Sequence, residues 1–267
     1  MSRQVGVRGV QLVYERSGTA APPFVWGHGL TSSRSNENET RLIDFAALAA
    51  EREVVRYDAR GHGESGSTAG PAEYAWSELA LDQLALADAL GIDRYVAGGA
   101  SMGCGTALHA AVTAPDRIAA LVLVIPPTAW ETRAAQTSQW EASAHVLETH
   151  GVERLIEGRA KLPPPDPFTA DRAWREQGNA NLRLWNIARL ARVFRGAAVA
   201  DLPGREAITT IGVPTLILAW SGDAAHPVST ADSLHALIAG SQLVIGSTPG
   251  ELATWTDRIC EFLRGIS

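Results

Sequence analysis

The sequence predicts an α/β fold with a mostly parallel sheet, helices on both faces and an inserted helical cap. Three observations carry this prediction. Short β-branched runs alternate with longer helical runs, which is typical of a parallel sheet. The middle, residues 128–200, is helical in pattern and is broken by a proline-rich stretch at 163–167. The length of 267 residues suits one core with an insertion. We therefore expect a core of residues 1–127 and 201–267, with the cap at 128–200.

The individual elements follow from local patterns. Strands are expected where short apolar runs end at glycine, proline or aspartate, and helices where apolar residues recur every three or four positions. The predicted strands cover residues 10–15 (in a hairpin with 5–7), 23–26, 54–57, 94–97, 118–125, 214–220 and 242–245. The predicted core helices cover residues 39–52, 77–90, 102–114, 228–239 and 252–264.

Composition excludes several classes of protein. A net charge of −6 offers no basic surface to a nucleic acid or an anionic membrane. Two cysteines argue against a disulfide scaffold and a structural zinc site. No apolar run reaches the roughly 18 residues of a membrane span, and residues 1–9 contain no apolar secretory segment. We expect a cytoplasmic protein without a membrane or nucleic-acid partner.

A candidate nucleophile lies between a predicted strand and a predicted helix. The segment GASMG, residues 99–103, has the G-x-S-x-G pattern of a nucleophile elbow in the strand–turn–helix context that this turn requires. Glycines two residues before and two after Ser101 remove clashes that larger side chains would cause. The helix beginning at Met102 would direct its N-terminal amides at a developing anion. The pattern predicts Ser101 as a nucleophile.

Loops after three other strands bear on the same site. In WGHGL, residues 26–30, the backbone N–H near Leu30 is predicted to pair with that of Met102 as an oxyanion hole, with Gly29 in the same turn. His28 is predicted to contact the substrate or to orient this loop. The segment DARGHGES follows the strand at 54–57, and SGDAAHP, residues 221–227, follows the strand at 214–220.

Together these motifs resemble the α/β-hydrolase fold family over about residues 1–125 and 208–267. The family shows a His-Gly turn, a D-x-R-G-H-G-x-S loop, a G-x-S-x-G elbow and an acidic G-x-D-x-x-x-P loop. The resemblance implies an α/β-hydrolase fold and a serine, acid, histidine order along the chain. Asp223 matches the place of the acid, and a helix cap is the other interpretation of this residue.

The family histidine has no counterpart here. Family members carry it in a loop after the final strand, but residues 242–255 contain no histidine, and none follows His235. A serine hydroxyl is a poor nucleophile unless a base takes its proton. His226, three residues after Asp223, is the best substitute on sequence grounds. The cap residues His145 and His150, and Glu251 near the vacant place, remain alternatives.

The cap would select the ligand. It contains four of the eight tryptophans, which either pack the cap onto the sheet or line an apolar pocket. The four are Trp130, Trp140, Trp174 and Trp185. The arginines at 183, 189, 192 and 195 either meet a substrate carboxylate or form a solvated helix face. The predicted partner is a small apolar or aromatic molecule.

These observations predict a small-molecule hydrolase of ester, thioester or lactone bonds that uses Ser101 with Asp223 and a non-standard base. Two alternatives remain at this stage. One is a catalytically impaired protein that binds an apolar ligand in the same pocket. The other is a lyase or isomerase that uses the oxyanion hole without serine attack. No metal or organic cofactor is predicted, because no ligand cluster or phosphate-binding loop is found in the sequence.

Overall fold

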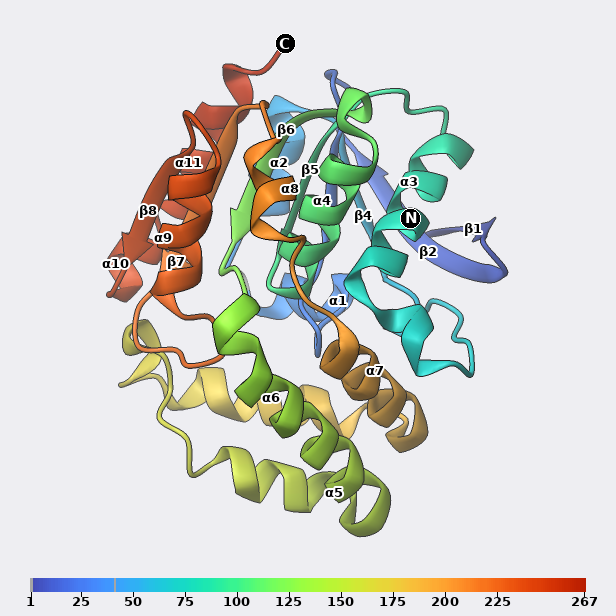
Figure 1. The fold of residues 1–267 in the computed structure, drawn as a ribbon, viewed down its shortest axis with the longest axis vertical. Coiled ribbons are helices and arrows are strands. Elements are labelled where there is room, and N and C mark those ends of the chain that lie inside the picture. The colour runs from blue at the N-terminus through green and yellow to red at the C-terminus, as the bar shows by residue number, and fades with distance from the viewer. Residues whose placement is uncertain (1, 41) are drawn as a thin grey trace.

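The computed structural model describes residues 2–40 and 42–267, and within them eight strands form one sheet (Figure 1). The order across the sheet is β1-β2-β4-β3-β5-β6-β7-β8. The strands are β1 (Arg3–Val7), β2 (Val10–Ser17), β3 (Phe24–Gly27), β4 (Val54–Tyr57), β5 (Tyr95–Ala100), β6 (Ile118–Val124), β7 (Thr215–Trp220) and β8 (Gln242–Gly246).

The sheet is mostly parallel, as predicted. Strand β2 pairs antiparallel with both β1 and β4, whereas every pairing from β4 through β3, β5, β6 and β7 to β8 is parallel. The carboxyl ends of the parallel strands therefore lie along one edge of the sheet. Loops that follow β3, β5 and β7 meet at this edge, which places the predicted site motifs together.

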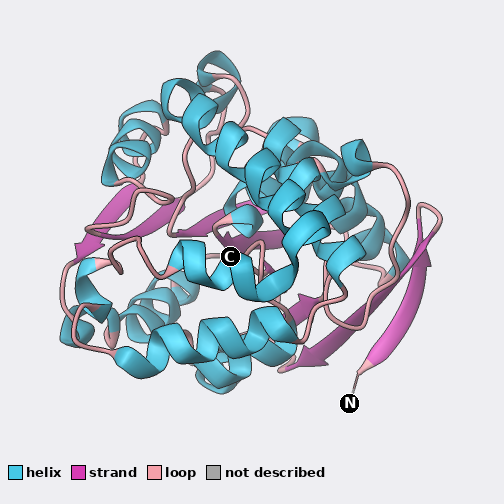
Figure 2. Ribbon diagram, turned by 90° about the horizontal axis from the view of Figure 1, so that it is seen from below, coloured by secondary structure: helices cyan, strands magenta, loops and turns pink. Residues whose placement is uncertain are grey.

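Helices cover both faces of the sheet (Figure 2). One face packs against α3 (Trp76–Ala89), α4 (Met102–Thr113) and α9 (Val228–Leu237). The other packs against α2 (Phe45–Glu51) and α11 (Trp255–Arg264). Side chains alternate between the two cores along the second half of β6, where Leu121 and Leu123 join the first and Val122 and Val124 the second.

The segment between β6 and β7 is helical, as its pattern predicts. It contains α5 (Arg133–Arg159), α6 (Arg172–Arg183) and α7 (Ile187–Val199), which lie together below the sheet in Figure 1. Helix α5 bends at Gly151, whose φ of 79° breaks the helical path. Buried residues of these helices form a separate apolar cluster around Leu147, Leu190 and Phe194. We call this helical layer the cap; its limits at 128 and 200 remain a prediction.

The remaining helices are short: α1 (Arg34–Thr40), α8 (Arg205–Thr209), α10 (Pro249–Leu252), and the 3₁₀ turns η1 (Pro71–Tyr74), η2 (Pro115–Arg117), η3 (Trp130–Thr132) and η4 (Asp166–Phe168). The prediction of one helix over residues 39–52 was wrong. Helix α1 ends at Thr40, and α2 begins after Asp44, whose carboxylate accepts from the N–H groups of Ala46 and Ala47. Residue 41, inside the predicted helix, lies outside the described residues.

Candidate active site

Ser101 occupies a strained turn between β5 and α4. Its φ of 52° and ψ of −108° are unusual for a residue with a side chain, and such strain is concentrated at functional sites. A Cβ atom at Gly103 would overlap the carbonyl oxygen of Gly27, and one at Gly99 would lie 2.5 Å from the same oxygen. The two glycines of the predicted elbow therefore allow the turn to pack against β3. Ser101 itself is half-buried, so solvent reaches it.

A chain of hydrogen bonds joins Ser101 to the loop that follows β7. The hydroxyl of Ser101 lies 2.8 Å from Nε2 of His226, and Nδ1 of His226 lies 2.7 Å from Oδ2 of Asp223. When the hydroxyl donates to Nε2, the imidazole carries its proton on Nδ1 and donates it to Asp223. This is the arrangement by which a histidine removes a serine proton while a carboxylate fixes the tautomer.

Asp223 is held by three donors. Its Oδ2 accepts from His226 and, at 2.9 Å, from the indole N–H of Trp220, while its Oδ1 accepts from the backbone N–H of Ala225 at 2.9 Å. Burial acts to raise the pKa of this carboxyl, but the hydrogen bonds and the neighbouring imidazole together hold the pKa well below its ordinary value. Asp223 is therefore ionised at neutral pH. Trp220 was not among the predicted site residues.

The predicted oxyanion donors flank the serine. Met102 is the first residue of α4, so its N–H has no acceptor within the helix. A Cβ built on Gly29 would lie 3.8 Å from Cβ of Ser101, which places the Gly29–Leu30 peptide beside the hydroxyl. The carbonyl of Gly29 accepts from His28 and from the backbone of Ser32. The C=O and N–H groups of a trans peptide point in opposite directions. The N–H of Leu30 therefore points away from the side of the peptide on which His28 and Ser32 lie.

His28 does not have the free ring nitrogen that a substrate contact needs. The side chain is 1% exposed; Nδ1 donates to the carbonyl of Gly29, and Nε2 accepts from the backbone of Ala59. The prediction that His28 contacts substrate is corrected accordingly, and the residue orients the Gly29–Leu30 peptide instead. His62 is also buried and lies with Nε2 2.8 Å from the carbonyl of Leu30, which supports the same turn from the other side.

The alternative bases lie elsewhere in the described part of the chain. His145 and His150 are exposed on α5. The carboxylate of Glu251 accepts from the backbone of Ser247 and Thr248 as part of the N-terminal cap of α10. These bonds lower the pKa of Glu251, which weakens it as a base. His226 is thus the histidine that the fold brings to Ser101.

The four cap tryptophans all have packing partners. Trp140 stacks on Phe194, Trp174 stacks on Phe168, and Trp185 meets the ring of His62 edge-on. The indole of Trp130 donates to the carbonyl of Pro203. Trp185 therefore lies on the histidine that supports the Leu30 turn, while Trp174 stacks on Phe168, which in turn meets the ring of Trp220 edge-on.

Three of the four cap arginines singled out from the sequence are engaged with the protein. Arg183 pairs with Glu153 and Arg195 pairs with Glu148, each on the cap surface, while Arg189 donates to the backbone of Gly63 in the core. A further polar contact between cap and core joins Asn181 to the carbonyl of Thr31, beside the Leu30 turn. These arginines hold the cap together and to the core, so three of the four are not free to meet a substrate carboxylate.

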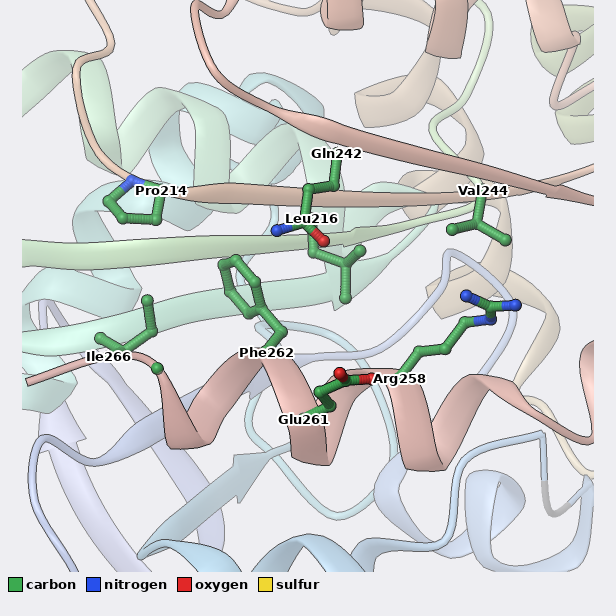
Figure 3. Close-up of a pocket in the computed structure, with 9 residues that line it drawn as sticks. Pro214, Leu216, Gln242, Val244, Arg258, Glu261, Phe262 and Ile266 are labelled. Carbon is green, nitrogen blue, oxygen red and sulfur yellow. The ribbon is translucent and has the colours of Figure 1, made fainter.

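A separate groove lies on the face of the sheet that α11 covers. It runs between β7, β8 and α11, where Leu216 and Val244 face Arg258, Glu261 and Phe262 of the helix (Figure 3). None of the Ser101, Asp223 or His226 side chains lines it. The residues that line the groove include no serine, cysteine or histidine.

Two further features concern residues 2–40 and 42–267. None of the helices there combines the length and apolar character needed to cross a bilayer. Within the same ranges, no three His, Cys, Asp or Glu side chains are grouped so that they could hold a metal ion.

The fold and the site define the class of the protein: it has the α/β-hydrolase fold. A family model described as alpha/beta hydrolase fold matches residues 22–148. The crystal structure of the enol-lactonase from Burkholderia xenovorans LB400 superposes with a TM-score of 0.82 at 25% identity, covering 98% of this chain and 99% of that one.

Individual relatives are hydrolases by name. A protein of Klebsiella pneumoniae (strain 342) named "Putative carbamate hydrolase RutD" is 29% identical over 220 residues, which is 81% of this chain and 80% of that protein. The 3-oxoadipate enol-lactonase 1 of Acinetobacter baylyi is 31% identical over 193 residues, 69% of this chain and 65% of that protein. These similarities support a hydrolase that acts on small molecules.

Proposed function

We propose that this protein hydrolyses an ester, thioester or lactone bond of a small molecule through Ser101, with His226 as the base and Asp223 as its partner. One observation carries the proposal: the unbroken hydrogen-bond chain from the Ser101 hydroxyl through the imidazole to the Asp223 carboxylate. Nucleophile, base and orienting acid have the mutual geometry that covalent catalysis by a serine requires.

The reaction would proceed in two halves. The Ser101 oxygen attacks the carbonyl carbon as its proton passes to Nε2 of His226, and the resulting oxyanion accepts from the N–H groups of Leu30 and Met102. The intermediate then expels the alcohol, which takes the proton from Nε2, and leaves an acyl-serine. Water next loses a proton to His226, attacks the acyl carbon and releases the acid, while the proton returns to the Ser101 oxygen.

The substrate class follows from the cap and from the relatives. The aromatic side chains of the cap, with Trp185 against the His62 ring that bonds the Leu30 carbonyl, favour an apolar or aromatic small molecule. The similarity to proteins named as enol-lactonases supports a lactone or ester rather than a peptide. No cofactor takes part in the proposed reaction.

The two alternative functions were motivated by the vacant histidine position. A ligand-binding protein without catalysis, or a lyase or isomerase, is favoured when no base can reach the serine. The 2.8 Å approach of His226 to Ser101 removes that reason, and so it favours hydrolysis. Both alternatives remain as outcomes of the experiment.

The test compares the wild type with Ser101→Ala. A fluorophosphonate probe should label the wild type once, at Ser101 in the peptide map, and p-nitrophenyl butyrate should be turned over. Ser101→Ala should lose both. Absence of labelling together with turnover no higher than that of Ser101→Ala would exclude the proposal in favour of ligand binding or non-hydrolytic chemistry.

A further inference from the structure

Trp220 has a polar contact that links it to the proposed base. It is the last residue of β7, three positions before Asp223, and its side chain is buried. Its indole N–H donates to Oδ2 of Asp223 at 2.9 Å, and this same oxygen accepts from Nδ1 of His226 at 2.7 Å. The donor therefore acts on the oxygen that orients the imidazole.

The indole ring is also clamped by aromatic neighbours from three directions. It stacks on Trp255 of α11 with ring centroids 6.4 Å apart, and it meets the ring of Phe168 edge-on at 5.3 Å. Its own edge-to-face contact with the His226 ring spans 6.0 Å at 86°. Trp174 of the cap stacks behind Phe168 at 4.7 Å. The indole is thus fixed between a core helix and the cap, independently of its contact with the base.

The cap segment that supplies Phe168 lies against the place where family members carry their histidine. Within η4, the backbone N–H of Asp166 donates to the carbonyl of Ser221, and the Ser221 hydroxyl donates to Oδ2 of Asp166. The hydroxyls of Ser221 and Ser247 lie 2.9 Å apart, which connects η4 to the loop after β8. The loop after β8 thus contacts the cap rather than supplying a base. Phe168 of η4 in turn packs against Trp220.

We propose that Trp220 is a positioning residue that fixes the Asp223 carboxylate, and through it the His226 imidazole, toward Ser101. This inference rests on the proposed function. Acid and base lie three positions apart on one loop, so any reorientation of the Asp223 carboxylate also reorients the imidazole that is bonded to it. The indole N–H supplies direction, and the aromatic clamp supplies rigidity.

Removing the N–H has two expected consequences. The imidazole loses its fixed orientation, and a displacement of about 1 Å in a catalytic group lowers the rate by up to about 100-fold. Without this donor, less of the negative charge on Oδ2 is offset, so the carboxylate stabilises protonated His226 more strongly. The acid limb of activity then moves to higher pH. Arg159 and Asp166, the other charged groups near Asp223 and its loop, remain unchanged in the variants below.

The structure offers a matched control in the stacking partner. The indole nitrogen of Trp255 is buried and has no hydrogen-bond partner among the described residues. Trp220→Phe and Trp255→Phe remove the same volume from the same stacked pair, but only the first removes an N–H that an acceptor uses. The difference between them reports the hydrogen bond rather than the packing.

The experiment measures kcat and KM for p-nitrophenyl butyrate over pH and, separately, the NMR titration of the His226 ring in protein without substrate. Trp220→Phe should lose roughly 10- to 100-fold in kcat with KM within about twofold, and both its acid limb and its imidazole midpoint should move to higher pH. Trp255→Phe trims the clamp but keeps the Trp220 N–H, so it should lose less kcat than Trp220→Phe and leave the imidazole midpoint in place. Equal kcat and equal titration midpoints in the two variants would overturn the inference.

Two additions keep the outcomes separate. If Trp220→Phe fails to fold, 3-benzothienylalanine at position 220 keeps the bicyclic shape and replaces N–H by sulfur, and the same shifts are expected. The NMR titration needs no turnover: an inactive wild type whose imidazole midpoint still moves in the variant excludes the proposed function but retains the positioning role. An active wild type with no difference between the two variants retains the proposed function but excludes the positioning role of Trp220.

Discussion

Nε2 of His226 lies 2.8 Å from the hydroxyl of Ser101, although the two residues are 125 positions apart and the histidine follows Asp223 by only three. The sheet order explains the approach. Ser101 follows β5 and the acid loop follows β7, with β6 between them, so the two strand ends are about 10 Å apart. The loop SGDAAHP turns back over the end of β6, where Thr128 donates to the carbonyl of Ala225, and His226 spans the remaining gap.

Replacing this histidine tests the base directly. His226→Ala should lower kcat for p-nitrophenyl butyrate by about 10⁴- to 10⁶-fold, because the serine hydroxyl then has no proton acceptor. His145→Ala is the matched control, since that ring is exposed on the cap, and it should keep wild-type kcat. A His226→Ala enzyme within tenfold of the wild type would show that another group takes the proton.

The sequence predicted the elbow well because its requirements are local. A strand, two glycines around a serine and a following helix are all recognisable within about ten residues, and the structure places Ser101 in that turn. Asp223 and His226 were named from their position after a strand. The distance between His226 and Ser101 was beyond prediction, because it depends on the pairing of β5, β6 and β7.

Other features had no signal in the sequence. The indole of Trp220 has an ordinary place at the end of a buried strand, and its donation to Asp223 depends on one side-chain orientation. His28 was expected to contact the substrate or to orient its loop; both ring nitrogens are bonded to backbone groups, of Gly29 and Ala59, which only the folded structure brings to the ring. The break before α2 was missed because the cap at Asp44 lies inside an otherwise helical pattern.

Asp223→Asn tests the role of the charge. One carboxylate oxygen accepts from Ala225 and the other from both Trp220 and His226, so an amide NH₂ in either place faces a donor. If it faces His226, the imidazole is held in the tautomer that cannot accept the serine proton. We expect kcat to fall by about 10⁴-fold with little change in KM, as measured by steady-state kinetics. Unchanged kcat in this variant would mean that Asp223 serves only its loop.

The pH dependence of activity should reflect a single group on its acid side. The base must be neutral to accept a proton, so activity rises with pH as the imidazole loses its charge. The depressed pKa of Asp223 keeps the carboxylate ionised throughout this range. A plot of log(kcat/KM) against pH should therefore have a limiting slope of one on its acid side. A slope of two would show that a second group titrates with the base.

The same shift predicts how acid affects stability. The pKa of Asp223 is lower in the folded protein than in the unfolded chain, so its contribution to stability is present above about pH 4 and is lost as pH falls through the folded value. Asp223→Asn lacks this contribution. In urea unfolding, the free energy of unfolding of the wild type should exceed that of the variant at pH 7. The difference between the two free energies should shrink as the pH falls below 4. A difference that grows instead would contradict the assigned direction.

Two glycine substitutions separate the strained turn from ordinary helix positions. In Gly103→Ala, the new methyl group would overlap the carbonyl oxygen of Gly27, so β3 and α4 must move apart. This change should destabilise the protein by more than about 3 kcal/mol and abolish fluorophosphonate labelling. Gly178, within α6, has no atom within 4 Å of a Cβ built there. Gly178→Ala should therefore stabilise by about 0.5–1 kcal/mol with unchanged kcat, as measured by urea unfolding. A Gly103→Ala protein that is as stable and as readily labelled as the wild type would show that the elbow does not depend on close contact with β3.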